Sequence, residues 1–232
     1  ERANIRARGV GGVHDENAQR WWGLERATYL TRDLLDVLAQ HERLDERHGD
    51  PQALATAMRS VADLLATAGG PPVLTMTLHA PQVHGFFSVP VDHLTALGVL
   101  AEHFAEQDLS DAVVVSPDFG NAKTASQLAR LLGLPVAAGS KKRLADDRVV
   151  IDAIVGDVEG KRAIVLDDEI ATGGSIVELL DRLAEQGCTT AAVACTHGLF
   201  VGKAVERLRD HPMISEVVVT DTVPRPADDW PA

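Results

Sequence analysis

One stretch of the sequence, residues 163–175 (AIVLDDEIATGGS), limits the possible folds more than any other. It opens with the apolar run Ala163–Leu166, which is typical of a buried parallel strand. The acids Asp167 and Asp168 follow, then a short turn, and then a helical spacing of apolar residues over 176–183. The order strand, loop and helix predicts an open α/β sheet, in which ligands bind at the carboxyl ends of the strands.

The turn between this strand and this helix has the composition of an anion site. Gly173 and Gly174 let a ligand approach the backbone closely, and Thr172 and Ser175 add hydroxyl donors. The start of the following helix adds backbone N–H groups that suit a phosphate. The two acids instead suit the neutral hydroxyls of a sugar such as ribose, or a magnesium ion. An ordinary helix N-cap beside two acids is the alternative, but the combination favours a site for a phosphate and a sugar diol.

Composition excludes some classes of function. The chain has 232 residues and a net charge of −12, so a nucleic-acid-binding surface is not expected, whereas small phosphorylated substrates are compatible. The two cysteines, Cys188 and Cys195, are in or near one predicted strand and cannot form a disulfide framework. No apolar run is long enough to cross a membrane and no signal peptide is visible, so we expect a cytoplasmic protein without membrane contacts.

From residue 73 onward, apolar runs and helical patterns alternate, which predicts a mostly parallel sheet flanked by helices. A helix from Pro51 to the Gly69-Gly70 pair precedes this region. We expect strands at 73–78, 112–116, 135–140, 149–155, 163–166, 189–196 and 214–221. We expect further helices at 17–44, 92–107, 121–132, 176–183 and near 200–210, and loops at 1–15, 41–50, 79–91 and 141–148.

Two more loops follow predicted strands. His79 comes after the 73–78 strand, and Asp118 comes after the 112–116 strand. If these strands are neighbours, the two side chains can ligate a divalent cation or orient its waters. A hydrogen-bonded structural histidine and a helix-capping aspartate are the alternatives, and sequence spacing does not decide between them.

Several blocks of the sequence resemble one enzyme family. The central loop resembles the PRPP-binding loop of the phosphoribosyltransferase fold, and the flanking blocks are similar to ribose-phosphate pyrophosphokinase (PRPP synthetase). These blocks are collinear: TLHAPQVHGFFSVPVDHL (77–94), VVVSPDFG…GSKKR (113–143), GDVEGKRAIVLDDEIATGGS (156–175), ACTHGLFVGKAVERL (194–208) and VVVTDTV (217–223). The resemblance implies a phosphoribosyltransferase-like α/β fold. It implies a truncated or remodelled N-terminal domain over 1–90 and, over 91–232, a C-terminal domain that binds ribose 5-phosphate.

The same resemblance implies a role for each matched residue. Lys141 and Arg143 match the cationic pair of the mobile catalytic loop, although a KKR run on its own is more often a solvated patch. His79 and Asp118 match residues that hold catalytic Mg²⁺. The implied substrate-binding residues are Asp167 and Asp168 for the ribose hydroxyls, Ala171, Thr172, Gly173, Gly174 and Ser175 for the 5-phosphate, and Pro117, Phe119 and Gly120 for the pyrophosphate.

The implied reaction is pyrophosphoryl transfer from Mg-ATP to O1 of ribose 5-phosphate, giving PRPP and AMP, by a homo-oligomer built from dimers, commonly a hexamer. The sequence departs from the family pattern at Thr77, Thr124, Ser140 and Ala171, and residues 1–58 do not resemble it. The F-x-D-G-E and Y-A-R-Q-D motifs that bind ATP in the family are not found. Two alternatives therefore stay open: a type I phosphoribosyltransferase that consumes PRPP, and a non-catalytic regulatory homologue.

Overall fold

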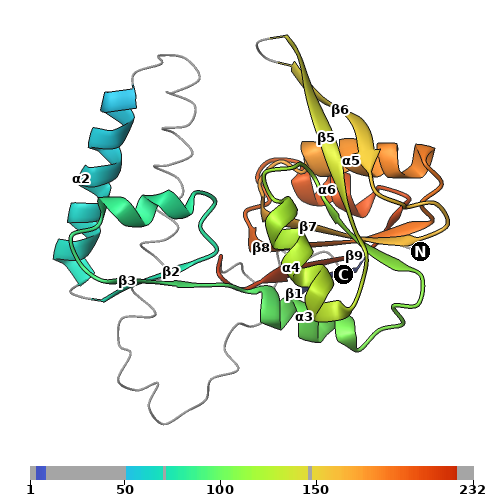
Figure 1. The fold of residues 1–232 in the computed structure, drawn as a ribbon, viewed down its shortest axis with the longest axis horizontal. Helices are drawn as coiled ribbons and strands as arrows, with labels where there is room; N and C mark the ends of the chain where they lie inside the picture. The colour runs from blue at the N-terminus through green and yellow to red at the C-terminus, as the bar shows by residue number, and fades with distance from the viewer. Residues whose placement is uncertain (1–3, 9–50, 70–71, 146–147, 224–232) are drawn as a thin grey trace. The chain divides into compact units, whose positions relative to one another are not determined.

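The computed structural model describes residues 4–8, 51–69, 72–145 and 148–223 (Figure 1). The chain divides into two compact units. The larger unit consists of Glu1–Val10 together with Ala96–Ala232, and the smaller unit is Gly11–Thr95. Each unit is described by itself below.

A seven-stranded sheet forms the centre of the larger unit, with the strand order β1-β9-β8-β7-β4-β5-β6. All neighbouring strands in it are parallel except β5 and β6, which pair antiparallel. The mostly parallel sheet expected from the alternating pattern is thus confirmed. Its strands are β1 (Asn4–Arg8), β4 (Ala112–Ser116), β5 (Val136–Ala145), β6 (Arg148–Val155), β7 (Arg162–Ile170), β8 (Thr190–Gly198) and β9 (Ile214–Thr220).

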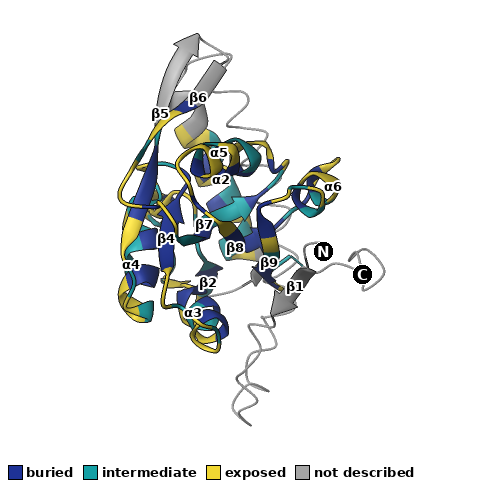
Figure 2. Ribbon diagram, turned by 90° about the vertical axis from the view of Figure 1, so that its right-hand side faces the viewer, coloured by how far each residue is buried: buried dark blue, intermediate teal, exposed yellow. Residues whose placement is uncertain are grey.

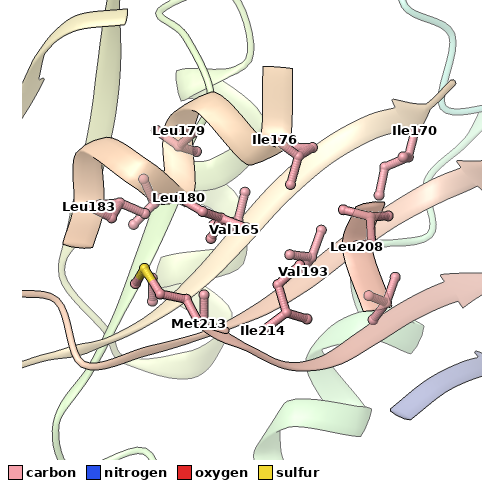
Figure 3. Packing of buried hydrophobic residues seen from close by; sticks show 14 of the residues in the cluster. Val165, Ile170, Ile176, Leu179, Leu180, Leu183, Val193, Leu208, Met213 and Ile214 are labelled. Carbon is pink, nitrogen blue, oxygen red and sulfur yellow. The ribbon is translucent and has the colours of Figure 1, made fainter. Parts of the chain in front are cut away.

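Helices cover both faces of this sheet, because the central strands are apolar on both sides. In β7, Ala163 and Val165 belong to one hydrophobic cluster, and Ile164 and Leu166 belong to another. The first cluster is closed by α5 (Gly174–Glu185) and α6 (Ala204–Arg209), and Figure 3 shows its packing. The second is closed by α3 (Leu97–Ala105) and α4 (Ala122–Leu132). In Figure 2 the buried residues gather in the strands, and exposed residues lie on the outer sides of the helices.

The smaller unit contains a helix, a short 3₁₀ helix and a parallel pair of strands. Its elements are α2 (Pro51–Gly69), β2 (Val73–Met76), η2 (Pro81–Phe86) and β3 (Val91–Leu94), with β2 paired to β3. The predicted helix that begins at Pro51 is confirmed. After β2 the backbone turns through Thr77, whose φ of 43° lies in the left-handed region, and the Thr77 N–H donates to the Leu94 carbonyl at 2.9 Å.

Several predicted elements differ from those observed. Residues 1–15 were expected to form a loop, but β1 lies within them and pairs with β9. The predicted 92–107 helix begins only at Leu97, since the preceding residues pair with β2 as β3. The predicted charged loop 141–148 is mostly strand, because β5 continues to Ala145 in an antiparallel ladder with β6. The hydrogen bonds of a β-ladder join backbone N–H and C=O groups and do not depend on the side chains. The run of charged residues therefore did not indicate a loop there. The predicted 17–44 helix and 41–50 loop lie outside the described residues.

Within the part of the chain that the structure describes, no helix is both long and apolar enough to span a bilayer.

Candidate functional site

The loop predicted at 171–175 follows β7, but its last two residues, Gly174 and Ser175, already belong to the first turn of α5. Gly173 takes the N-cap position of α5 with a φ of 72°, a left-handed conformation that a side chain would strain. Its carbonyl accepts the Val177 N–H at 3.1 Å, which starts the helix. Thr172, Gly174 and Ser175 are exposed. The loop therefore presents two hydroxyls and the amino end of a helix to solvent, an arrangement that suits an anion.

Backbone and side-chain donors fix the entry to this loop. The Ile170 and Ala171 carbonyls each accept an N–H from the segment after β8, from Phe200 and Val201 respectively, both at 2.9 Å. Arg207 in α6 donates from Nη1 to the Thr172 carbonyl at 3.1 Å. The loop conformation is thus set by α6 and by the β8–α6 connection as well as by its own glycine. The sequence analysis missed Arg207, because nothing in its local pattern distinguishes it from a surface arginine.

The acid pair lies inside β7, since this strand runs on to Ile170 rather than ending at Leu166 as predicted. Both side chains are half-buried and fold back along the backbone. Asp167 Oδ1 accepts the Asp168 N–H, and Asp168 Oδ1 accepts the Glu169 N–H, both at 2.9 Å. Each acid thereby satisfies one backbone donor next to it.

The carboxylate of Asp167 lies in an environment that disfavours its charged form. Burial and repulsion by Asp168, with a smaller contribution from Asp118, raise the pKa of Asp167 from 3.8 to about 8. The carboxylates of Asp168 and, more weakly, of Asp118 therefore lie close enough to repel that of Asp167. A bound cation or hydroxyl donors would relieve this repulsion, as expected of a ligand site rather than of a structural pair.

The loop after β4 carries Asp118. Its Oδ1 accepts the Asn121 N–H at 3.1 Å just before α4, so the alternative role as a helix-start residue is partly correct. Ser116 Oγ donates to the Asp118 carbonyl at 2.6 Å. Asn121 Nδ2 donates to the Leu166 carbonyl at 2.9 Å and so joins this loop to β7 one residue before the acid pair. β4 and β7 are neighbours in the sheet, which explains why these segments converge.

The other residues predicted to face the pyrophosphate belong to the same loop. Pro117 is buried, whereas Phe119 is 58% exposed and Gly120 is also exposed. β5 passes very close to this loop, because a Cβ built on Gly139 would lie 2.5 Å from the Pro117 carbonyl oxygen. Only glycine fits there without a shift of the backbone.

His79 is an exposed residue of the smaller unit, whereas Asp118 belongs to the larger one. The expectation that they follow neighbouring strands is wrong, because β2 pairs with β3 in a separate sheet. Next to His79, the Leu78 N–H donates to His93 Nε2 at 3.0 Å. Burial and the nearby His84 lower the pKa of His93, which favours the neutral ring that accepts this bond. Among the described residues, no three or more metal-ligating side chains converge, so a shared metal role of His79 and Asp118 stays a prediction.

Lys141 and Arg143 lie in strand β5 rather than in a loop. Lys141 is opposite Ile151 and Arg143 is opposite Val149 in β6. The two strands form a ribbon that extends past the rest of the sheet in Figure 1.

Cys195 pairs with Asp167 in the register of β7 and β8 and is fully buried. Burial, together with the negative charges of Asp167 and Asp168, raises the pKa of its thiol well above the usual value. The thiol is therefore protonated at neutral pH and serves as packing beneath the acid pair.

Comparisons with known proteins identify the family of this chain. Residues 151–229 match the family described as the phosphoribosyl synthetase-associated domain. A protein of Streptomyces coelicolor named "Putative ribose-phosphate pyrophosphokinase" is 60% identical over 180 residues, which are 78% of this chain and 57% of that protein. The ribose-phosphate pyrophosphokinase of Deinococcus radiodurans is 46% identical over 181 residues, 77% of this chain and 56% of that protein. The chain thus spans little more than half the length of these curated relatives.

A solved structure extends the match to the whole chain. The crystal structure of phosphoribosylpyrophosphate synthetase from Mycobacterium smegmatis superposes with a TM-score of 0.69 at 32% identity. The match covers 98% of this chain and 74% of that one. The chain therefore belongs to the ribose-phosphate pyrophosphokinase (phosphoribosylpyrophosphate synthetase) family.

Proposed function

We propose that this protein transfers pyrophosphate from Mg-ATP to O1 of ribose 5-phosphate, giving PRPP and AMP. The observation that carries the proposal is the acid pair Asp167 and Asp168, half-buried in β7 and separated by three residues from a Thr-Gly-Gly-Ser segment at a helix start. This arrangement offers acceptors for sugar hydroxyls and donors for a phosphate within one strand–loop–helix unit. The names of the matched relatives support the same reaction.

In this proposal the sugar phosphate is bound at two places, its 5-phosphate and its ribose hydroxyls. Residues 171–175 bind the 5-phosphate, and Asp167 and Asp168 accept hydrogen bonds from the ribose hydroxyls. The raised pKa of Asp167 means that the free acid pair keeps a proton near neutral pH. Hydroxyl donors from the sugar can replace that proton as the partner of the two carboxylates.

The residues also fit the proposed Mg²⁺. Carboxylate oxygens are the ligands that Mg²⁺ prefers, and it usually uses one or two of them together with substrate phosphates and water. Asp118 would hold the ion, and the repulsion that Asp168 and Asp118 exert on Asp167 favours a cation nearby. We propose that His79 orients its waters. When bound, Mg²⁺ supplies charge neutralisation on the phosphates.

The proposed transfer needs little covalent chemistry from the protein. The O1 hydroxyl attacks the β-phosphorus of ATP. The O1–Pβ bond forms, the bond from Pβ to the α,β-bridging oxygen breaks, AMP leaves, and the hydroxyl proton passes to water. Positioning and charge stabilisation supply most of the catalysis in such reactions. We propose that Lys141 and Arg143 meet the negative charge that redistributes over the phosphates, with Pro117, Phe119 and Gly120 beside the pyrophosphate.

The test is product formation from ATP, ribose 5-phosphate and Mg²⁺, followed by chromatography. We expect AMP and PRPP in equal amounts, both dependent on the sugar. Base-dependent consumption of PRPP without AMP formation would instead support a type I phosphoribosyltransferase. Nucleotide binding with no turnover in either assay would support a regulatory homologue. The homo-oligomeric assembly remains a prediction from the resemblance, and the cytoplasmic location remains a prediction from the sequence composition.

A further inference from the structure

We infer that Glu178 is a positioning residue that locks the base of the β5–β6 ribbon onto helix α5. It would thereby fix the position of the β5 segment that carries Lys141 and Arg143 relative to the 171–175 loop. The inference rests on the proposed function for its kinetic consequence, but its structural part is testable without any activity.

One short hydrogen bond joins β6 to α5, two elements that are separated in the sequence. Glu178 in α5 accepts the backbone N–H of Ile151 in β6 through Oε1 at 2.7 Å. Glu178 follows Gly174, the first residue of α5, by one helical turn, so the acceptor lies next to the loop proposed to bind the 5-phosphate. A charged acceptor on a backbone N–H makes one of the stronger hydrogen bonds in proteins.

The backbone amide of Ile151 lies at an irregularity in the pairing of β5 with β6. β5 advances by one residue, from Ser140 to Lys141, while its partners in β6 change from Ala153 to Ile151. Asp152 is therefore the extra residue of a β-bulge, and bulges bend a strand and change the direction of its groups. Ile151 is the register partner of Lys141, so Glu178 bonds the residue opposite the first proposed catalytic cation.

A second contact of the same residue strengthens this attachment. The Ile151 side chain is only 1% exposed and belongs to the hydrophobic cluster that α5 closes with Leu179 and Leu183. The ribbon is thus held to α5 at Ile151 both by its side chain and by its backbone. Hydrophobic packing is tolerant of small shifts, whereas a hydrogen bond fixes the distance and direction.

A neighbouring cation, Arg182, lies on the same helix as Glu178. Arg182, one turn further along α5, has its pKa raised by Glu185 first and also by Glu178 and Asp152. Arg182 Nη1 bonds Glu185 Oε2 at 2.7 Å. The guanidinium therefore lies close enough to interact with Glu178 while its direct partner is Glu185, which leaves the Glu178 oxygen available to the Ile151 amide.

The test compares Glu178→Met with Glu178→Gln, because both keep the length of the side chain but only glutamine keeps an acceptor oxygen. Glu185→Ala, on the same helix, is the matched control. Hydrogen exchange measured by mass spectrometry on peptides covering 141–155 should be faster in Glu178→Met by about tenfold. It should stay near the wild-type rate in Glu178→Gln and in the control. If Glu178→Met does not fold, Glu178→Ala is measured in the same way.

The kinetic readout is the split between kcat and KM. Glu178→Met should lower kcat for PRPP formation by about tenfold, with the KM for ribose 5-phosphate within about twofold, and Glu178→Gln should restore kcat. Unchanged exchange in Glu178→Met, or a Glu178→Gln variant as defective as Glu178→Met, would overturn the inference. If the wild type makes no PRPP, the proposed reaction fails, and the exchange result alone decides on the attachment.

Discussion

The environment of Asp167 differs strongly from that of an ordinary surface acid. Its pKa of about 8 in the folded chain lies above the usual 3.8, so the folded state keeps a proton that the unfolded state has lost between these values. Stability from this group is therefore present at low pH and is lost as the pH rises from about 4 to about 8. In the absence of substrate, the acid pair makes the fold less stable at neutral pH.

Asp167→Asn should remove this dependence. The free energy of unfolding of the variant minus that of the wild type should increase by on the order of 3 kcal/mol between pH 5 and pH 8, because only the wild type loses this stability. Thermal unfolding of both proteins at the two pH values measures it. A difference that stays constant with pH, or that moves the other way, would show that Asp167 does not hold a proton in the folded protein.

His79 provides a second prediction for a single residue. If it orients the waters of a bound Mg²⁺, His79→Ala should raise the Mg²⁺ concentration for half-maximal PRPP formation severalfold, about 1 kcal/mol of ion binding. His211→Ala is the matched control, because His211 bonds Asp181 in the larger unit. Full activity of the wild type in EDTA would defeat the metal-assisted reaction.

At the scale of elements, the antiparallel ribbon carries the two cations. An interaction made mainly in the transition state lowers kcat and kcat/KM together. Lys141→Ala should therefore lower kcat by about a hundredfold, on the order of 3 kcal/mol, with little change in the affinity for ribose 5-phosphate. Arg143→Ala should behave similarly, and the double variant should be less than additive if both act on the same charge.

Steady-state kinetics at saturating Mg²⁺ measures this effect. Lys161→Ala serves as the control, since Lys161 is occupied by an ion pair with Asp157 before β7. A kcat of Lys141→Ala within twofold of the wild type would identify the KKR run as a solvated patch.

The sequence predicted elements best where a local pattern is sufficient. The strand 112–116 matches β4, and the helix 121–132 differs from α4 by one residue, because apolar periodicity and the Gly133 C-cap are both local signals. The sequence did not predict the strands that form only because a distant strand pairs with them. Asn4 pairs with Glu216 at the far end of the chain, and no local pattern reveals such a partner. The β3 segment likewise became a strand because β2 was available to pair with it.

The candidate site shows the same division. The acid pair and the 171–175 loop are contiguous and were recognisable from residue types alone. Asn121, Glu178 and Arg207 were missed, because each bonds the backbone of a distant segment. Asn121 bonds the Leu166 carbonyl, Glu178 the Ile151 amide and Arg207 the Thr172 carbonyl. Such contacts depend on tertiary placement, and their side chains look like ordinary surface residues in the sequence.

At the scale of the whole molecule, the larger unit gathers the proposed site from non-consecutive strands. β7 provides the acids, β4 the Asp118 loop and β5 the cations, and β5, β4 and β7 are consecutive neighbours in the sheet. The parallel strands direct their carboxyl ends to one edge, where ligands of open α/β sheets bind. The central claim is that this edge binds a sugar phosphate through the acid pair and the adjoining loop.

Isothermal titration calorimetry with ribose 5-phosphate tests that claim most directly. The wild type should bind one sugar per chain. Asp168→Asn should raise the Kd at least about tenfold, because a neutral amide accepts weaker hydrogen bonds from hydroxyls than a carboxylate does. Asp210→Asn, on an exposed residue paired with Arg209, should leave the Kd unchanged. No binding to the wild type, or equal affinity in Asp168→Asn, would contradict the account.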